Sequence, residues 1–591
     1  AASGPGPSRF PSKESSSSFD SMSMSKSGAA FGAGAGAAAG VSGHRHNLSY
    51  DQGKAPATPR QDSATTTYML WDNGKDDLDD ALHTPDPKGV SDTYHWDPWS
   101  LRGWINVLAI FVLLGALITL FAGWPIIVFY KDHFASNGAN TAGFNLGGIN
   151  ATGQVPKMPD FASLIDKDTP ENVMARTGFD GKDYQLVFSD EFNTDGRTFY
   201  PGDDPFWEAV DLHYWPTGDM EWYDPGQITT KDGALVIEMR QEPTHEFDYR
   251  SGMLQSWNKF CFSKNAYIEV AVQLPGNTRV GGFWPGAWTM GNLGRPGYGA
   301  TTEGTWPYSY DACDVGTLPN QTWINGTGPA AALTTGSNDG VLSFLPGQRW
   351  SACTCPGEDH PGPSVNKGRG SPEIDIIEAQ INIADAIGEV SQSLQTAPFD
   401  DFYQWDNTSA SATLYYPNEM QFNSYVGGVY QEAVSCLVNT DRTNYRSQGG
   451  GFGVYGFEYT GDPNDRDNGY VTWVSSGKPS WNVKASVTGA NPRVGISQRP
   501  IPEEPMTIIL NFGMSNNFQY VDLENLDFPN YMYIDYVRVY QRTDMINIGC
   551  DPDDYPTQDY ISRHAEAYNN RNLTTWDLVS FRWPKNSLQG C

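Results

Sequence analysis

The chain has 591 residues, of which 39% are hydrophobic and 13% aromatic, and its formal net charge is −31. So large an excess of carboxylates excludes nucleic acid as an expected partner, because the phosphate backbone would be repelled. A neutral polysaccharide would be indifferent to this charge, and the 19 tryptophans offer flat apolar faces that suit either sugar rings or a core.

Residues 1–101 form a low-complexity segment. It contains a run of serines at 15–18 and a glycine–alanine tract at 32–40. Such a segment has little apolar surface to bury, so we predict a disordered cytoplasmic tail. No charged stretch followed by a short apolar run stands at the start, so we expect no cleavable signal peptide.

Residues 102–130 are predicted to form one transmembrane helix. No charged residue lies between Arg102 and Lys131, and about 20 apolar residues are enough to cross the hydrocarbon core of a membrane. Aromatic residues that suit the two membrane interfaces flank the span: Trp99, Trp104, Trp124 and Tyr130. The span therefore predicts a membrane protein.

The orientation of the span is inferred from the features that follow it, because Arg102 and Lys131 nearly cancel. All seven cysteines lie beyond the span, and disulfides form in oxidising compartments. The glycosylation sequons beyond the span are at Asn150, Asn320, Asn325, Asn407 and Asn572, against one at Asn47 before it. We therefore predict a single-pass type II protein of a secretory-pathway membrane (endoplasmic reticulum, Golgi or plasma membrane), with its C-terminal part lumenal or extracellular. With an odd number of cysteines at least one stays unpaired, and the connectivity is left open.

The remaining chain divides by composition. Residues 131–180, rich in Gly and Asn and then in Pro and Asp, are predicted to be a stem. Residues 181–545 contain short strands broken by turn residues, which is typical of an all-β sandwich, and 546–591 form a C-terminal extension. Two regions, roughly 291–370 and 431–500, exceed ordinary loop length. They either wall a binding cleft or are variable decoration.

One stretch carries three carboxylates within six residues: Glu373, Asp375 and Glu378, separated by isoleucines. β-branched residues favour a strand, on which Glu373 and Asp375 share a face. Glu378 is out of phase by one residue, and a single β-bulge would return it to that face. Such a cluster predicts glycoside cleavage, which uses one carboxylate as nucleophile and one carboxylic acid as proton donor. A calcium site and a solvated acidic strand are the alternatives.

The motif Glu-Ile-Asp-Ile-Ile-Glu resembles the signature of glycoside hydrolase family 16 in its bulged, laminarinase-like form. Other stretches resemble strands of that family in the expected order: residues 186–193, 220–223, 232–237, 251–254, 283–288 and 533–540. The resemblance implies a β-jelly roll with a carbohydrate cleft across its concave sheet. It implies that Glu373 is the nucleophile, Asp375 its helper and Glu378 the acid/base. With its membrane anchor, the chain is similar to the fungal membrane-anchored proteins required for β-1,6-glucan assembly.

Six further residues are candidates for substrate binding: Trp284, Trp288, Gln395, Asn511, Trp473 and Trp481. The first two lie in a run that resembles the family's cleft strand, so we expect at least one to stack on a sugar; otherwise both are core. Gln395 stands where many family members carry a histidine that contacts the substrate beyond the cleaved bond, which argues against a plain laminarinase specificity. Asn511 matches a cleft-facing strand or caps a turn, and the last two tryptophans flank a predicted turn.

No cofactor is expected, and no metal is predicted. Cys353 and Cys355 form a C-x-C pair without the second pair that a metal site needs. Asp535 matches the position of a calcium ligand in some members of the resembled family, but an edge-exposed Asp is an equal alternative.

The functional prediction is a retaining β-glucan-active hydrolase or transglycosylase whose substrate is a β-1,3- or β-1,6-glucan. The alternative is a non-catalytic glucan-binding or scaffold protein, which would have no need for Glu373 and Glu378 together. Protein partners, linkage, and the choice between hydrolysis and transfer are not readable from the sequence.

Overall fold

A computed structural model describes residues 101–123, 163–336 and 338–591. The predictions made for residues 1–100 and 124–162 lie outside the described residues. They include the tail, most of the stem, and the sequons at Asn47 and Asn150.

The described part of the predicted span is helical. The helix α2 (Leu101–Ile118) continues into a π-helical turn, η1 (Thr119–Gly123). The stretch Trp104–Phe121 is long and apolar enough to cross a membrane, and none of it is buried (0%). Its large apolar side chains are therefore exposed, which suits a helix surrounded by lipid better than a core helix.

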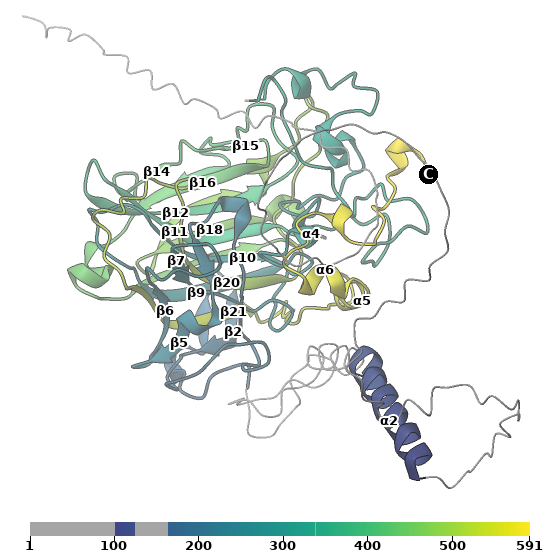
Figure 1. The fold of residues 1–591 in the computed structure, drawn as a ribbon. Helices are drawn as coiled ribbons and strands as arrows, with labels where there is room; N and C mark the ends of the chain where they lie inside the picture. The colour runs from purple at the N-terminus through teal and green to yellow at the C-terminus, as the bar shows by residue number, and fades with distance from the viewer. Residues whose placement is uncertain (1–100, 124–162, 337) are drawn as a thin grey trace, which may run out of the picture. The chain divides into compact units, whose positions relative to one another are not determined.

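Two antiparallel sheets make up the body of the protein, as Figure 1 shows. The first, here called the back sheet, has ten strands. They are β1 (Ala175–Thr177), β2 (Asp183–Asp190), β5 (Ile228–Lys231), β6 (Ala234–Met239), β9 (Asn265–Gln273), β13 (Ala412–Leu414), β17 (Gly453–Thr460), β18 (Tyr470–Ser475), β19 (Lys478–Lys484) and β21 (Asn530–Arg542). Their order is β1-β2-β21-β9-β17-β18-β19-β13, with β6 beside β21 and β5 beside β6.

The second sheet, here called the site sheet, has nine strands. They are β3 (Glu208–Ala209), β8 (Met253–Gln255), β10 (Phe283–Gly291), β11 (Glu373–Asn382), β12 (Ile387–Thr396), β14 (Met420–Phe422), β15 (Gly427–Gly428), β16 (Gln431–Asn439) and β20 (Met506–Met514). Their order is β14-β16-β12-β11-β10-β20-β8-β3, with β15 beside β16. A separate parallel pair joins β4 (Glu221–Tyr223) to β7 (Tyr249–Ser251).

Short helices and turns connect these strands. The α-helices of the body are α4 (Gly299–Thr302), α5 (Gln558–Arg563) and α6 (Ala565–Asn569). The 3₁₀ turns are η2 (Glu171–Val173), η3 (Trp215–Thr217), η4 (Pro225–Gln227), η5 (Val315–Thr317), η6 (Pro319–Gln321), η7 (Ala331–Leu333), η8 (Arg442–Asn444), η9 (Arg446–Gln448), η10 (Arg466–Asn468), η11 (Ala485–Thr488), η12 (Trp576–Leu578) and η13 (Ser587–Gln589).

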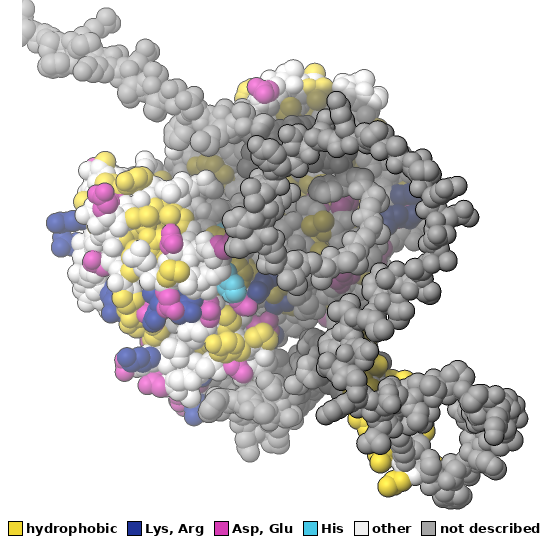
Figure 2. Space-filling model, in the orientation of Figure 1, with side chains coloured by type: hydrophobic (Ala, Val, Ile, Leu, Met, Phe, Trp, Pro, Cys, Tyr) yellow, Lys and Arg dark blue, Asp and Glu magenta, His cyan; other side chains and the backbone are white. Residues whose placement is uncertain are grey.

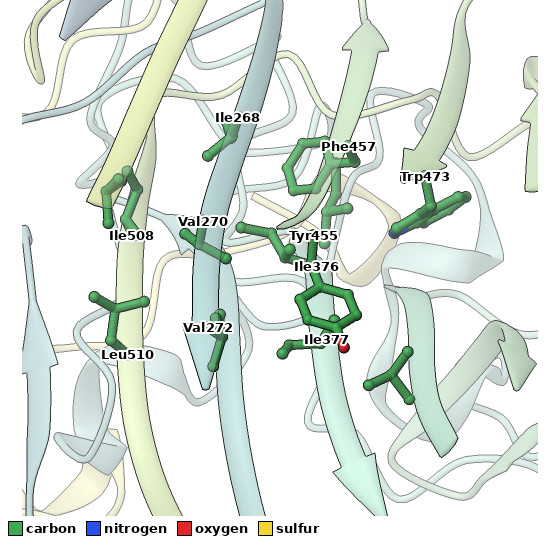
Figure 3. Packing of buried hydrophobic residues seen from close by; sticks show 14 of the residues in the cluster. Ile268, Val270, Val272, Ile376, Ile377, Tyr455, Phe457, Trp473, Ile508 and Leu510 are labelled. Carbon is green, nitrogen blue, oxygen red and sulfur yellow. The ribbon is translucent and has the colours of Figure 1, made fainter. Parts of the chain in front are cut away.

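The main hydrophobic core lies between the two sheets. Alternate residues of β9 and β17, such as Val270 and Phe457, face isoleucines of β11 and β20 (Figure 3). Because side chains on a strand alternate between its faces, the inward residues fill the core while the intervening ones face outward. This arrangement confirms the predicted all-β sandwich and leaves the outer face of the site sheet free for polar side chains.

Two boundaries differ from the prediction. The region 431–500 is not one long loop, because β16, β17, β18 and β19 all lie within it. Gly456 lies inside β17, where a Cβ would come 2.2 Å from the carbonyl oxygen of Ile268. The sheet also begins earlier than residue 181, since β1 takes residues from the predicted stem.

The other long loop is confirmed and has a core of its own. Residues 292–372, here called the insertion, contain no strand and only α4, η5, η6 and η7. Part of the insertion packs into a separate hydrophobic cluster around Tyr308 and Leu342. Another part packs against the C-terminal extension (residues 546–591), where Trp350 meets Tyr560 and Trp576. Insertion and extension therefore form one lobe beside the sandwich.

Disulfides fasten this lobe. Cys313 is bonded to Cys353, and Cys355 is bonded to the last residue, Cys591. A third disulfide joins Cys261 to Cys550, and Cys436 is a buried free thiol. The predicted odd cysteine is thus confirmed, and the C-x-C pair belongs to two different disulfides rather than to a metal site.

On the face that Figure 2 shows, acidic side chains are not gathered into one patch. Acidic side chains are spread over the face of the sandwich shown in Figure 2, with basic side chains among them. The net charge therefore identifies no binding surface by itself.

Candidate active site

The three predicted acids lie on β11 around a β-bulge. Asp375 stands opposite Ser393 of β12 and Glu378 opposite Ser391, so three steps along β11 match two steps along β12. The register with β10 also shifts at this point. Ile376 and Ile377 are both fully buried in the core (Figure 3). The bulge therefore turns two consecutive isoleucines inward and brings Glu378 back to the face of Glu373 and Asp375, as the sequence predicted.

Each acid has hydrogen-bond donors from a different part of the chain. The indole N–H of Trp306 donates to Oε2 of Glu373 at 2.7 Å, and that of Trp284 donates to Oε1 of Glu378 at 3.2 Å. Oδ2 of Asp375 accepts bonds from Ser393 Oγ at 2.6 Å and Gln395 Nε2 at 3.1 Å. Asp375 is buried, whereas both glutamates keep part of their surface open. The glutamates are thus the acids that a ligand can reach.

The insertion is anchored immediately before these acids. Arg369 and Glu504 form a buried two-point ion pair, with N–O distances of 2.7 and 2.8 Å. Two residues later, the backbone N–H of Ser371 donates to the carbonyl of Thr305 at 2.8 Å. Because Trp306 follows Thr305 directly, this bond fixes the tryptophan beside Glu373.

The environment raises the pKa of all three acids. Burial is the main cause for Glu373, followed by the charges of Asp375 and Glu378, and its pKa lies well above the ordinary value although Trp306 opposes the shift. Burial and the charge of Asp375 raise the pKa of Glu378 in the same way. Burial raises the pKa of Asp375 to about 6, with the bonds from Ser393 and Gln395 acting against it. Close carboxylates in a dry site cannot all ionise, so the cluster holds protons near neutral pH.

A second buried acid pair supports the floor of the site. Asp219 accepts a hydrogen bond from Tyr223 at 2.9 Å, and the Tyr223 hydroxyl accepts one from Asn511 at 3.1 Å. Asn511 in turn accepts from the indole of Trp288 at 2.9 Å. Burial and the charge of Asp219 raise the pKa of the neighbouring Glu221. This chain fixes Trp288, which stands opposite Asp375 in the sheet.

Tyr214 lies between the two groups of acids. Burial is the main cause that raises its pKa, and the charges of Glu373 and then Asp219 add to it. Its ring meets the edge of the Trp288 ring, with centroids 6.4 Å apart. A phenol that lies among carboxylates stays protonated, so its hydroxyl is a hydrogen-bond donor in the site.

On the other side of the acids, a row of polar side chains crosses the site sheet. Ser391, opposite Glu378, is bonded through its hydroxyl to that of Ser435 on β16 at 3.0 Å. Asn423 donates its amide to the same Ser435 hydroxyl at 3.1 Å. The row thus runs from Glu378 across β12 and β16 to the edge of the sheet.

Exposed aromatic side chains follow this polar row. Tyr425 and Tyr430 are 54% and 56% exposed, and Phe344 of the insertion meets Tyr430 with ring centroids 6.0 Å apart. The backbone N–H of Tyr425 donates to Oδ1 of Asn423 at 3.0 Å, which places this residue at the end of the polar row. Together these rings form an open aromatic rim at the end of the polar row.

The predicted substrate residues fall into two groups. Trp284, Trp288 and Asn511 lie around the acids on β10 and β20, and Gln395 stands opposite Glu373 on β12. Gln395 is buried and holds Asp375. The predicted role of the two remaining tryptophans is wrong.

Trp473 and Trp481 lie in the core rather than in the site. Both are 0% exposed, and their rings stack on each other at 4.4 Å. The predicted turn between them exists, with positive φ at Ser476 and Gly477, but it orients both rings inward (Figure 3 for Trp473). A sugar has no access to them. Trp473 instead donates its N–H to the backbone carbonyl of Asp375 at 2.8 Å and so supports the bulge from behind.

Several residues of the site were missed in the sequence. Trp306 lies within a loop that was expected to wall the cleft, but nothing in its spacing marks it as a partner of Glu373. Asp219 and Tyr214 lie in a segment without regular alternation. Glu221 carried a signal, because it lies in a stretch that resembles a family strand.

The four sequons within the described residues are all exposed: Asn320, Asn325, Asn407 and Asn572. Within the same described ranges, no group of three or more His, Cys, Asp or Glu side chains has the arrangement of a metal site.

Comparison with known proteins places the chain among related sequences. The sequence profile described as "Beta-glucan synthesis-associated protein SKN1/KRE6/Sbg1" matches residues 69–591. Beta-glucan synthesis-associated protein KRE6 of Saccharomyces cerevisiae is 42% identical over 552 residues, which cover 91% of this chain and 72% of that protein. Beta-glucan synthesis-associated protein SKN1 of Candida albicans is 40% identical over 579 residues, which cover 92% and 73%.

Solved structures show a more distant likeness. The endo-beta-1,3-glucanase of Pyrococcus furiosus matches with a TM-score of 0.36 at 17% identity, over 63% of this chain and 98% of that chain. The laminarinase of Rhodothermus marinus matches with a TM-score of 0.35 at 20% identity, over 61% and 97%.

Proposed function

Because the chain belongs to the family of beta-glucan synthesis-associated proteins SKN1/KRE6/Sbg1, we propose that it acts in the synthesis of cell-wall β-glucan as a retaining glycosidase or transglycosylase. The observation that carries the proposal is the bulged strand β11. It presents two glutamates with raised pKa values on one face, with a buried aspartate between them. The substrate is a β-glucan with β-1,3 or β-1,6 linkages.

In this proposal Glu373 attacks the anomeric carbon and forms a covalent glycosyl-enzyme. The Trp306 N–H stabilises the attacking carboxylate, because it lowers the pKa of Glu373 against the effect of burial. Asp375, held by Ser393 and Gln395, shares the proton of its neighbours and keeps Glu373 oriented. Glu378 starts protonated and gives its proton to the leaving sugar oxygen.

Glu373 and Glu378 repel each other when both are ionised, since the charge of Glu378 raises the pKa of Glu373, and the loss of this repulsion allows Glu378 to reverse its role. When Glu373 becomes an ester its negative charge disappears from the site, and one source of repulsion is lost. Glu378 then ionises more readily and acts as base toward the incoming hydroxyl group. If that group is water the reaction is hydrolysis, and if it is a sugar hydroxyl the reaction is transfer.

The polar row next to Glu378 and the open aromatic rim at its end support transfer. Ser391 and Ser435 are buried, so a sugar chain that follows the row would be hydrogen-bonded to Asn423 and would reach the exposed rings of Tyr425 and Tyr430. Aromatic side chains at partly wet sites bind one apolar face and leave polar groups hydrated. A surface of this kind holds an acceptor close to the base.

The experiment compares Glu373→Gln and Glu378→Ala in the full-length protein. Glu373→Gln is expected to abolish turnover of every substrate, because no covalent intermediate can form. Glu378→Ala is expected to lose activity on natural glucan, whose leaving group needs a proton, but to react with aryl or fluoride glycosides. Intact-mass spectrometry should then show one added glycosyl unit on Glu373.

Products from the unsubstituted protein decide between the two reactions. Incubation with defined β-1,3 and β-1,6 oligosaccharides should give longer products if the reaction is transfer, and only shorter ones if it is hydrolysis. The alternative of a non-catalytic glucan-binding or scaffold protein is favoured by the family description, which names association with synthesis rather than cleavage. Wild-type glucan assembly in cells that carry either substituted protein would establish that alternative.

A further inference from the structure

A second cavity lies in the lobe formed by the insertion and the C-terminal extension, and it shares no residue with the acid site. Its volume is about 280 Å³. The side chains that matter for its chemistry are Glu303 and Gln348 from the insertion, and Asp577, Trp583, Asn586 and Gln589 from the extension.

The walls of this cavity are fixed to each other. The backbone N–H of Cys355 donates to Lys585 at 2.9 Å, and that of Ser587 donates to Cys353 at 2.8 Å. The Cys355–Cys591 disulfide closes the same region. Asn586 donates its side-chain amide to the Thr317 hydroxyl at 3.0 Å. The cavity therefore exists before any ligand binds, which lowers the entropic cost of binding.

Gln348 offers an acceptor that has no partner. Its side chain is 97% buried, since the residue is 3% exposed. Its Nε2 donates to the carbonyls of Tyr310 at 2.8 Å and Arg369 at 3.0 Å, whereas its Oε1 is buried without a hydrogen bond. An unsatisfied buried acceptor is unfavourable, so a ligand hydroxyl that reached this oxygen would gain a hydrogen bond.

Trp583 supplies a flat apolar surface with a fixed orientation. A Cβ at Gly304 would come 2.4 Å from Cη2 of this ring, so the ring rests directly on the backbone of the insertion. Gly304 has φ +71, which also favours glycine at this position. The guanidinium of Arg349 lies 5.3 Å from the ring centroid. The indole thus has little freedom to move away from a ligand.

The lining selects against anions. It contains the carboxylates of Glu303 and Asp577, and no lysine or arginine is among its described residues. Carboxylates and a free amide oxygen accept bonds from hydroxyl groups, while the amides of Asn586 and Gln589 also donate. The volume lies just below the range of roughly 300–1,000 Å³ that is usual for small-molecule pockets, so the ligand is small.

We propose that this cavity is a second carbohydrate-binding site, separate from the acids of β11. It holds one or two sugar units at the end of a glucan chain. That the sugar is a glucan rests on the proposed function, whereas the cavity, its free acceptor and its fixed indole do not. A site of this kind would keep a glucan near the acid site between turnovers and so raise the effective concentration of substrate.

The test measures sugar binding by calorimetry with full-length protein carrying Glu373→Gln, so that turnover does not interfere. The titrants are β-1,3- and β-1,6-linked glucose trisaccharides. The parent protein is expected to bind one more molecule of trisaccharide per chain than a protein that also carries Asp577→Asn and Gln589→Ala. Both of these residues are exposed, so their replacement leaves the fold intact. Asp553→Asn, at an exposed position of the same extension, is the matched control and should bind like the parent.

Equal stoichiometry in the parent and the doubly substituted protein overturns the proposal. Binding of a small ammonium probe that the sugars fail to displace, and that is lost with Asp577→Asn, also overturns it, because the carboxylates would then serve a cation. Loss of the extra equivalent in Trp583→Ala, with the melting temperature unchanged, supports it. If the unsubstituted protein is inactive on every glucan but the additional trisaccharide still binds, the proposed function is wrong and the second binding site is supported.

Discussion

The indole N–H of Trp306, in the insertion, donates a hydrogen bond to the proposed nucleophile Glu373 at 2.7 Å. Trp306→Phe removes the N–H and keeps the ring. A hydrogen bond to a charged group is worth roughly 1.5–3 kcal/mol, so kcat/KM should fall about 10- to 100-fold.

The pH profile distinguishes this role from loss of packing. Trp306 lowers the pKa of Glu373, so its replacement should raise that pKa further and move the acidic limb of kcat/KM to higher pH. Trp222→Phe is the matched control, because its indole N–H donates to Asp211 at 2.8 Å away from the acids. An unchanged profile in Trp306→Phe would contradict the assigned role.

Asp375 should weaken the fold at neutral pH. Burial raises its pKa from 3.8 to about 6, so the folded protein binds this proton more tightly than the unfolded chain does. The stabilising effect of the proton is complete below about pH 4 and is lost as the pH rises through about 6, a change of about 3 kcal/mol. Asp375→Asn should therefore unfold at higher urea concentration than the parent at pH 8, with no gain at pH 4, while its turnover falls.

Asp467→Asn, at an exposed position, is the control for this measurement and should show no gain at either pH. A higher stability of Asp375→Asn at both pH values would show that the carboxylate is not strained by burial. A buried carboxylate that destabilises the folded protein when it is ionised is typical of functional sites.

At the scale of elements, the acid strand was the most predictable part of the molecule. Its bulge follows from counting residues: the two acids at 373 and 375 share a face, and the third needs one extra residue to join them. This prediction depends only on the alternation of side chains along one strand, so contacts made elsewhere in the chain do not change it. The strands at 186–193, 283–288 and 533–540 were instead expected from their resemblance to strands of glycoside hydrolase family 16, and β2, β10 and β21 lie there.

The residues that the sequence did not reveal depend on packing between distant segments. Trp306 reaches Glu373 across 67 residues of chain, and no local pattern encodes that distance. Trp473 and Trp481 were wrongly predicted to bind substrate. The sequence pattern of an aromatic residue on a strand is the same whether its side chain faces the core or a cleft. Only the partner sheet decides which face is buried.

The disulfides that fasten the lobe give a prediction at the same scale. Six of the seven cysteines are paired and Cys436 is buried, so thiol titration should detect one thiol per chain in denatured, unreduced protein and none in the native protein. Cys591→Ser should release Cys355 and raise the count to two. Because this disulfide closes a segment of 236 residues, its loss should destabilise the protein by about 2–4 kcal/mol. More than one thiol in the unsubstituted protein would contradict the pairing.

At the scale of the whole molecule, two described features favour one orientation of the chain across a membrane. The apolar stretch Trp104–Phe121 has the length of a span, and every disulfide lies beyond it. Disulfides between such distant segments persist in the secretory lumen and not in the cytosol.

We therefore predict a type II topology with glycans beyond the span. The sequons at Asn320, Asn325, Asn407 and Asn572 are exposed, so the oligosaccharyl transfer that occurs only in the lumen can reach them. Endoglycosidase treatment of the full-length protein should increase its gel mobility. This shift should vanish when these four and Asn150 are replaced by Gln, and it should stay unchanged in Asn47→Gln, the matched control before the span. A glycan on Asn47 would place the N-terminal segment in the lumen and reverse the topology, because a chain with one span exposes only one of its ends to the glycosylating enzyme.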